Sequence, residues 1–222
     1  MTEISEEAPT LDPSLLVRLR LRAHKLDRVF SDRPEALPDE CILPCLSSEL
    51  NGQAKFAQVR MGVGTNALFF QCDVQGKTQL PWCRESRLED SDGLHVWIDT
   101  RNSREVQRAT KFCHRYGFAP MGRGPKADLP FVGWATINRA RENPPPPPDD
   151  QLAIRARVAD GRYRLVAALH FNALSGLDLN DFPTIGFYFA VLDRELGWQS
   201  LALQPDLPVM DNPNLWAQMQ LA

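Results

Sequence analysis

Three side chains in the middle of the sequence could do acid–base or metal chemistry. His95 and Asp99 lie four residues apart in the run LHVWID, and His114 follows in the run KFCHRYGF. If the two runs pair as neighbouring strands, two imidazoles and a carboxylate could converge, and such a set can bind a transition metal or transfer protons. The histidines could instead form hydrogen bonds across a sheet without doing chemistry. The sequence therefore offers a candidate cluster but no reaction.

The first run must form a strand if it is to position these groups. Its residues alternate with a period of two, which places two sets of side chains on opposite faces. The aliphatic set is Leu94, Val96 and Ile98, and the second set is His95, Trp97 and Asp99. We expect the aliphatic set to fill a core and the second set to point away from it. The run from Lys111 to Phe118 also alternates, so two strands joined by a polar loop are predicted.

A second pattern crosses the same region, because basic residues recur there at helical spacing. They are Arg101, Arg104, Arg108, Lys111 and Arg115. A helix with such a stripe could bind an acidic partner. No stacking aromatic residues interleave the five cations, however, and the chain has a net charge of -3 and a pI of about 5.8. We therefore expect a solvated loop and no nucleic-acid partner.

Further strands are predicted on both sides of the central pair. Asp160-Gly161 between two alternating segments, 152–158 and 162–171, is a strong hairpin signal. Residues 119–150 are rich in glycine and proline and should form a long surface excursion, with a polyproline spacer at 144–148. We predict a disordered tail over 1–12 and one domain over 13–222. The core of this domain should span 54–203.

Composition and cysteine usage limit the class of protein. The chain has 222 residues, of which 43% are hydrophobic and 24% charged, as in an ordinary globular domain. Its five cysteines are odd in number and form no C-x-x-C motif, so free thiols are expected. No apolar run approaches the roughly 20 residues that cross a bilayer, and the N-terminus MTEISEEAPT is acidic and polar. These features predict a cytoplasmic location and no membrane partner.

The order of the predicted strands resembles a known family. The runs LHVWID, KFCHRYGF, GRYRLVAALHFNAL and FPTIGFYFAVLDRELGWQ resemble the family 9 carbohydrate-binding modules and related DOMON-like β-sandwiches, over roughly residues 54–203. The whole chain, including HRYGFAP, RARENP and DNPNLW, also resembles bacterial proteins of the Planctomycetes type that have no established activity. The resemblance implies an all-β fold, a two-sheet antiparallel β-sandwich of jelly-roll type. It also implies sugar binding through stacked aromatic rings, sometimes with structural calcium.

If this resemblance holds, the tryptophans are the first candidates for sugar contacts, because the C–H faces of a sugar are apolar and its hydroxyls need polar partners. Trp82 and Trp134 are expected in loops, Trp97 lies on the face opposite the aliphatic set, and Trp198 is a fourth candidate. The predicted ligand-binding residues are Trp82, Arg84, His95, Trp97, Asp99, His114 and Trp134.

Acidic residues near predicted turns offer two further kinds of site. They are Asp90, Asp92, Asp99, Asp193 and Glu195. Glycoside hydrolysis needs two carboxylates at a defined separation, which the sequence does not give. The first three, with Asn102, could hold Ca²⁺, but their spacing is not that of a dedicated calcium loop. We therefore predict no catalytic residue, no metal ligand and no cofactor.

These observations favour a non-catalytic binding module whose ligand is a carbohydrate. The alternative is a cytoplasmic protein-interaction domain that docks a protein partner through a sheet edge or the polyproline loop. A third alternative is an enzyme that uses the face of His95, Asp99 and His114.

Overall fold

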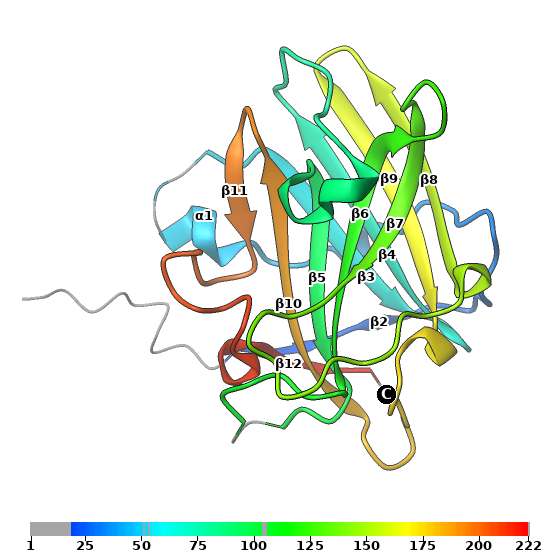
Figure 1. The fold of residues 1–222 in the computed structure, drawn as a ribbon, viewed down its shortest axis with the longest axis vertical. Helices are drawn as coiled ribbons and strands as arrows, with labels where there is room; N and C mark the ends of the chain where they lie inside the picture. The colour runs from blue at the N-terminus through cyan, green and yellow to red at the C-terminus, as the bar shows by residue number, and fades with distance from the viewer. Residues whose placement is uncertain (1–18, 51, 53, 104–105, 222) are drawn as a thin grey trace, which may run out of the picture.

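The structure is a computed structural model that describes residues 19–50, 52, 54–103 and 106–221. Its strands form two sheets packed face to face (Figure 1). Within the described residues the large sheet has seven strands in the order β1-β12-β10-β5-β6-β7, with β11 paired to β10. The small sheet has five strands there, in the order β2-β3-β4-β9-β8. The predicted tail over 1–12 lies outside the described residues.

The strands of the large sheet are β1 (Arg20–Arg22), β5 (Gly93–Asp99), β6 (Cys113–Arg123), β7 (Leu129–Ala135), β10 (Thr184–Asp193), β11 (Gly197–Ser200) and β12 (Ala217–Gln220). Those of the small sheet are β2 (His24–Lys25), β3 (Ala57–Val63), β4 (Ala67–Gln75), β8 (Leu152–Ala159) and β9 (Arg162–His170). The helical elements are α1 (Leu46–Leu50), η2 (Asp39–Cys41), η3 (Glu85–Asp90), η4 (Asp149–Gln151), η5 (Phe171–Ala173) and η6 (Pro213–Leu215).

Most neighbouring strands pair antiparallel, so the predicted all-β, two-sheet antiparallel sandwich is confirmed. Two pairs at the sheet edges are parallel, β1 with β12 and β2 with β3. Because only Ala23 separates β1 from β2, this short segment passes from the large sheet to the small one. The predicted hairpin at Asp160-Gly161 is also confirmed, with Gly161 at a φ of +71°, a conformation that glycine adopts easily.

The core lies between the two sheets. The aliphatic residues of β5, namely Leu94, Val96 and Ile98, are fully buried as predicted. Phe70 of the small sheet packs against Phe118 and Phe187 of the large sheet, with ring centroids 5.5 and 6.4 Å apart. Each such aromatic side chain buries a large apolar area, so these contacts join the two layers.

The second face of β5 is also buried, which corrects the expectation of an accessible surface. His95 is 3% exposed, Trp97 0% and Asp99 1%. The side chains point to the outer face of the large sheet, but other parts of the chain cover them. Tyr188 packs against Trp97 at 5.4 Å on this face, and its hydroxyl donates a hydrogen bond to the Leu203 carbonyl in the 201–216 segment.

The predicted excursion over 119–150 is wrong in its first half. Residues up to Arg123, including Gly122, continue β6, and β7 follows after a turn that contains Gly124; both glycines have positive φ. Trp134 therefore lies on a strand rather than in a loop. The later half, 136–148, contains neither helix nor strand within the described residues. Its Arg141 N–H donates to the Ala109 carbonyl at 2.7 Å, which fastens it to the body.

The basic stripe forms no helix among the described residues of the 100–112 segment, and Arg104 lies outside the described residues. All five cysteines are described and are free thiols, as predicted. Among the described residues we found no helix long and apolar enough to span a membrane.

Candidate functional site

A buried ion cluster joins three strand ends at one end of the sandwich. The Lys77 Nζ lies 2.7 Å from Asp193 Oδ2, 3.3 Å from Asp92 Oδ2 and 3.6 Å from Glu195 Oε2. The side chains of Lys77, Asp92 and Asp193 are at most 3% exposed. Lys77 follows β4 of the small sheet, while Asp92 precedes β5 and Asp193 ends β10 of the large sheet. One ammonium group thus ties the two sheets together.

The surroundings of Lys77 and Glu195 favour the charged form of each group. Burial alone would lower the pKa of Lys77, but the hydrogen bond and charge of Asp193, together with those of Asp92, raise it above its ordinary value. Hydrogen bonds from the Thr78 hydroxyl and from the Thr78 and Gln79 backbone N–H groups lower the pKa of Glu195 to about 2. Donors other than Lys77 therefore help to stabilise the excess negative charge of three carboxylates.

Asp92 also fixes the loop that precedes η3. Its Oδ2 accepts the Trp82 N–H and its Oδ1 accepts the Arg194 N–H, both at 2.9 Å. The Asp92 N–H in turn donates to the Trp82 carbonyl at 2.9 Å. A single buried carboxylate thus sets the positions of Trp82 and Arg194, which are far apart in the sequence.

Trp82, Arg84 and Arg194 form a surface that we call the Trp82 platform. The Arg194 guanidinium carbon lies 3.5 Å from the centroid of the Trp82 ring, and the Arg84 guanidinium carbon lies 5.2 Å from it. A separation as short as 3.5 Å places the Arg194 group over the ring face, where the cation–π attraction is strongest. The indole is half-buried and both arginines are exposed. The platform offers an apolar ring beside guanidinium donors.

The candidate cluster of His95, Asp99 and His114 does not form. Strands β5 and β6 do pair, but His114 is the register partner of Ile98 and so shares the inner, aliphatic face. Its Nε2 lies 3.2 Å from the Ser175 carbonyl, whereas the His95 Nε2 lies 3.1 Å from the Ser91 carbonyl on the outer face. Burial lowers the pKa of each histidine to about 4, with the nearby Arg115 charge adding to the effect at His95.

Asp99 accepts hydrogen bonds from the backbone of the loop after β5. Its two oxygens accept the N–H groups of Arg101 and Ser103 at 3.0 and 2.6 Å. Burial raises the pKa of this carboxyl, while these N–H groups oppose the rise. Such bonds from a short acidic side chain to following backbone groups stabilise a turn, so Asp99 is engaged in its own loop.

Two predicted tryptophans are engaged in packing. Trp97 is fully buried, with the Arg115 guanidinium 5.1 Å from its ring centroid. Trp134 is the register partner of Tyr116 on β6 and so faces the inner side of the sheet, where it packs against the core. Of the seven predicted ligand-binding residues, the structure brings Trp82 and Arg84 together at the surface. A ligand-binding role for any of the seven stays a prediction.

Sequence reasoning did not single out Lys77 or Arg194. Lys77 lies in the polar run QGKTQL and Arg194 in DREL, and neither run carries a motif that indicates a partner. Both residues become significant only because Asp92 and Asp193 arrive from other strands. No local signal in the sequence could have identified this arrangement.

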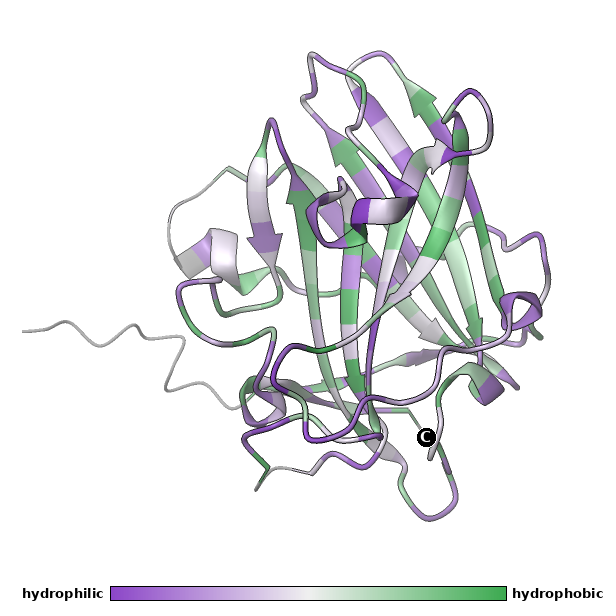
Figure 2. Ribbon diagram, viewed as in Figure 1, coloured by the Kyte–Doolittle hydropathy of each residue, from purple (hydrophilic) through white to green (hydrophobic). Residues whose placement is uncertain are grey.

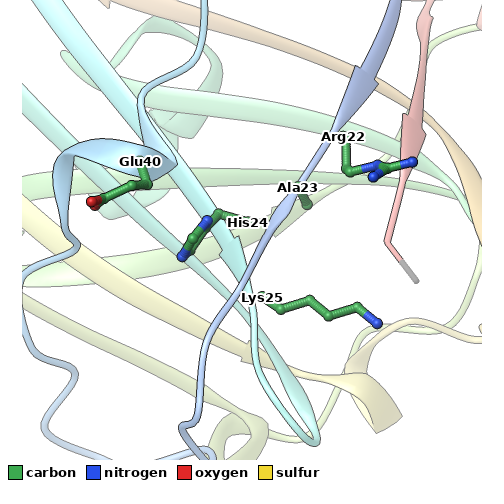
Figure 3. Close-up of a pocket in the computed structure, with 5 residues that line it drawn as sticks. All are labelled: Arg22, Ala23, His24, Lys25 and Glu40. Atoms are coloured by element: carbon green, nitrogen blue, oxygen red, sulfur yellow. The ribbon is translucent and has the colours of Figure 1, made fainter.

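A hollow of about 450 Å³ lies beside β1 and β2, at the edge of the sandwich. Arg22, Ala23, His24, Lys25 and Glu40 line it. Figure 3 shows Arg22 and Lys25 on one side of this segment and His24 and Glu40 on the other. The side chains do not converge on one point, so the hollow lacks the polar cluster of a specific site. Within the described residues no three His, Cys, Asp or Glu side chains group as metal ligands would.

Comparison with known proteins identifies the fold. No family model and no curated protein sequence matches the chain. Among solved structures, a family 9 carbohydrate-binding module of Caldicellulosiruptor kristjanssonii in complex with cellotriose superposes with a TM-score of 0.59 and 15% identity, covering 90% of this chain and 92% of its own. A family 9 module of the same organism in complex with glucose superposes with a TM-score of 0.58 and 16% identity, covering 91% of this chain and 95% of its own. A protein of Bacteroides uniformis superposes with a TM-score of 0.56 and 10% identity, covering 91% of this chain and 98% of its own. The chain has the fold of the family 9 carbohydrate-binding modules.

Proposed function

We propose that the protein binds carbohydrate and that the Trp82 platform contacts the sugar. The observation that carries this proposal is the likeness to modules that hold cellotriose and glucose, which extends over nine-tenths of both chains. A fold alone does not define a function. The half-buried ring and the exposed guanidinium groups of the platform supply the site chemistry that the proposal needs.

The chemistry of the platform suits a sugar. The apolar C–H face of a pyranose packs on indole, and its hydroxyl oxygens accept hydrogen bonds from guanidinium N–H groups. Arg194 already lies over one face of the Trp82 ring at 3.5 Å. A sugar therefore uses the remaining exposed part of the ring, with Arg84 and Arg194 as donors at its edge. Leu80, which is 71% exposed in the same loop, adds apolar surface.

The ion cluster gives the platform a fixed geometry before any ligand arrives. Asp92 holds the backbone of Trp82 and of Arg194, and Lys77 holds Asp92. Because ordering a loop on binding reduces affinity, a platform that is already ordered binds more tightly. Docking of a protein partner through a sheet edge or the polyproline segment stays a second prediction.

A glycan array followed by calorimetry tests the proposal. The intact chain should bind at least one neutral glycan, with cellotriose and glucose as the first soluble ligands to try. Trp82→Ala should weaken that binding at least tenfold, because it removes the stacking surface. Phe182→Ala is the matched control, since Phe182 is an aromatic side chain 37% exposed elsewhere on the surface. It should leave binding unchanged.

Thermal unfolding of both variants shows whether each remains folded. The proposal fails if no glycan on the array binds the intact chain. It also fails in its assignment of the site if folded Trp82→Ala binds as tightly as the parent.

A further inference from the structure

The outer face of the small sheet is covered over only part of its length. Leu37 and Cys41 pack there on Phe69, Ala153 and Ala168, and the contact involves the segment 26–41. Toward the β8–β9 turn this cover ends, and the alternation of β8 and β9 brings polar side chains to the surface. Figure 2 shows the alternation as bands of purple and green along these strands.

Four arginines share this uncovered region, which we call the arginine face. They are Arg155 and Arg157 on β8, and Arg162 and Arg164 on β9. All four are exposed. Each is separated from the next on its strand by two positions, so the side chains point the same way at intervals of about 6.6 Å. Arg157 is the register partner of Arg164.

This arrangement has an electrostatic cost. Side chains directly opposite each other on neighbouring strands are about 5 Å apart at Cβ, and like charges there destabilise the pair. The carboxylate on this face is Asp73 of β4, which accepts hydrogen bonds from Arg164, from Arg60 at 2.8 Å and from Gln71 at 2.6 Å. Its oxygens are thus already engaged. Within the described part of the chain, Arg155, Arg157 and Arg162 make no ion pair, and neither does the exposed Asp160 of the turn.

The face is also hollowed. A depression of about 320 Å³ lies here, and Asp73, Gln75, Arg157, Arg162 and Arg164 are among the residues that line it. Arg164 is held by Asp73, while the guanidinium groups of Arg157 and Arg162 are available to a ligand at the same depression. Guanidinium groups bind carboxylates through two parallel hydrogen bonds, which favours planar acidic groups over other ligands.

We propose that the arginine face binds a polysaccharide that carries carboxylate groups, that is, a chain of uronic acids. The unpaired guanidinium groups match its carboxylates, and the Gln58 and Gln75 amides of the same face can bond its hydroxyls. No aromatic side chain of the described outer residues lies beside the arginines to stack a nucleic-acid base. This surface is separate from the Trp82 platform, and the inference does not depend on the proposed function.

The test uses the whole chain and two matched polymers. Polygalacturonate should bind, whereas its fully methyl-esterified form, which has the same sugar backbone without the charge, should bind at least tenfold more weakly in affinity electrophoresis. The double variant Arg157→Gln/Arg162→Gln should weaken polygalacturonate binding at least tenfold. The control, Arg20→Gln/Arg141→Gln, removes two exposed arginines elsewhere and should leave binding unchanged.

Three results would overturn the inference. One is equal loss of binding in the control variant, which would indicate a general charge effect. The second is equal binding of the esterified polymer. The third is that polyglutamate or duplex DNA binds as tightly as polygalacturonate and is weakened by the same variant, which would assign the face to another partner. Trp82→Ala should leave polygalacturonate binding unchanged, so failure of this inference and failure of the proposed function are distinguishable.

Discussion

The outer faces of the two sheets differ in what covers them. On the large sheet, alternating side chains of β5 point outward and are nevertheless buried, with Trp97 at 0% exposure. On the small sheet, alternating side chains of β8 also point outward, and Arg155 and Arg157 remain exposed. Both strands follow the same period of two. A period therefore predicts on which side a residue lies, but not whether another segment covers that side.

The cover of the large sheet comes from distant segments. Leu88 of η3 lies directly over two glycines, because a Cβ added to Gly117 or Gly133 would come within 2.6 or 2.7 Å of its side chain. The 201–216 segment covers the neighbouring strands, where Trp216 donates its indole N–H to the Val209 carbonyl at 2.7 Å. The small sheet has no such cover over its arginine face among the described residues. Three predictions test this contrast.

The largest effect on stability is expected at Lys77 of the buried ion cluster, which lies at the start of the loop that leads to η3 and its Leu88. Lys77→Met leaves Asp92 and Asp193 buried without their cation, and breaking a buried ion pair in this way costs about 3–5 kcal/mol. Urea unfolding should show a loss of about 4 kcal/mol in the free energy of unfolding.

Lys55→Met is the matched control, because the Lys55 and Glu49 side chains form an ion pair at 2.9 Å while about half exposed. It should cost less than about 1 kcal/mol. Equal losses in the two variants would show that the cluster does not hold the sheet ends together.

A smaller effect is expected from His95 on the covered face. Its pKa of about 4 in the folded protein lies below the ordinary 6.5, because burial and then Arg115 disfavour the charged form. The unfolded chain therefore binds the extra proton first as the pH falls, and stability drops between pH 6.5 and 4 by about 3 kcal/mol for this residue. NMR titration of the imidazole checks this prediction. A His95 that titrates near 6.5 would mean that water reaches the outer face of the large sheet.

The smallest effects compare the two outer faces directly. Leu88→Ala removes the side chain that covers Gly117 and Gly133 and should destabilise the protein by about 2–3 kcal/mol. Arg157→Gln on the uncovered face should change stability by no more than about 0.5 kcal/mol, since it removes no buried contact. Thermal unfolding of the two variants side by side gives the comparison. Similar losses of stability in the two variants would contradict the inference that the outer face of the large sheet is covered and the arginine face is not.

The sequence predicted the elements whose signals are local. The alternation of Leu94, Val96 and Ile98 identified a core strand, and Asp160-Gly161 identified a two-residue turn. Trp134 was misplaced because Gly122 and Gly124 raised the glycine content of its surroundings. Gly122 in fact lies near the end of β6 and Gly124 directly after it, both at positive φ, so they mark the end of this strand before β7 begins.

The candidate site was predicted less well, because it depends on contacts between distant segments. Trp82 and Arg84 were identified from residue type, but Arg194 and Lys77 reach them through Asp92 and Asp193. Convergence of His95 and His114 was one of two alternatives that the sequence left open, because their strands were expected to be neighbours. Their register sets them on opposite faces, and a shift of one residue in pairing decides such a question.

The pairing of β1 with β12 has a consequence for synthesis on the ribosome. Arg20 to Arg22 have their partners in the large sheet at Gln218 to Gln220, almost 200 positions later in the chain. In a nascent chain Arg20 to Arg22 cannot pair with β12 until translation has passed Gln220. The large sheet therefore gains β1 only after β12 has been synthesised.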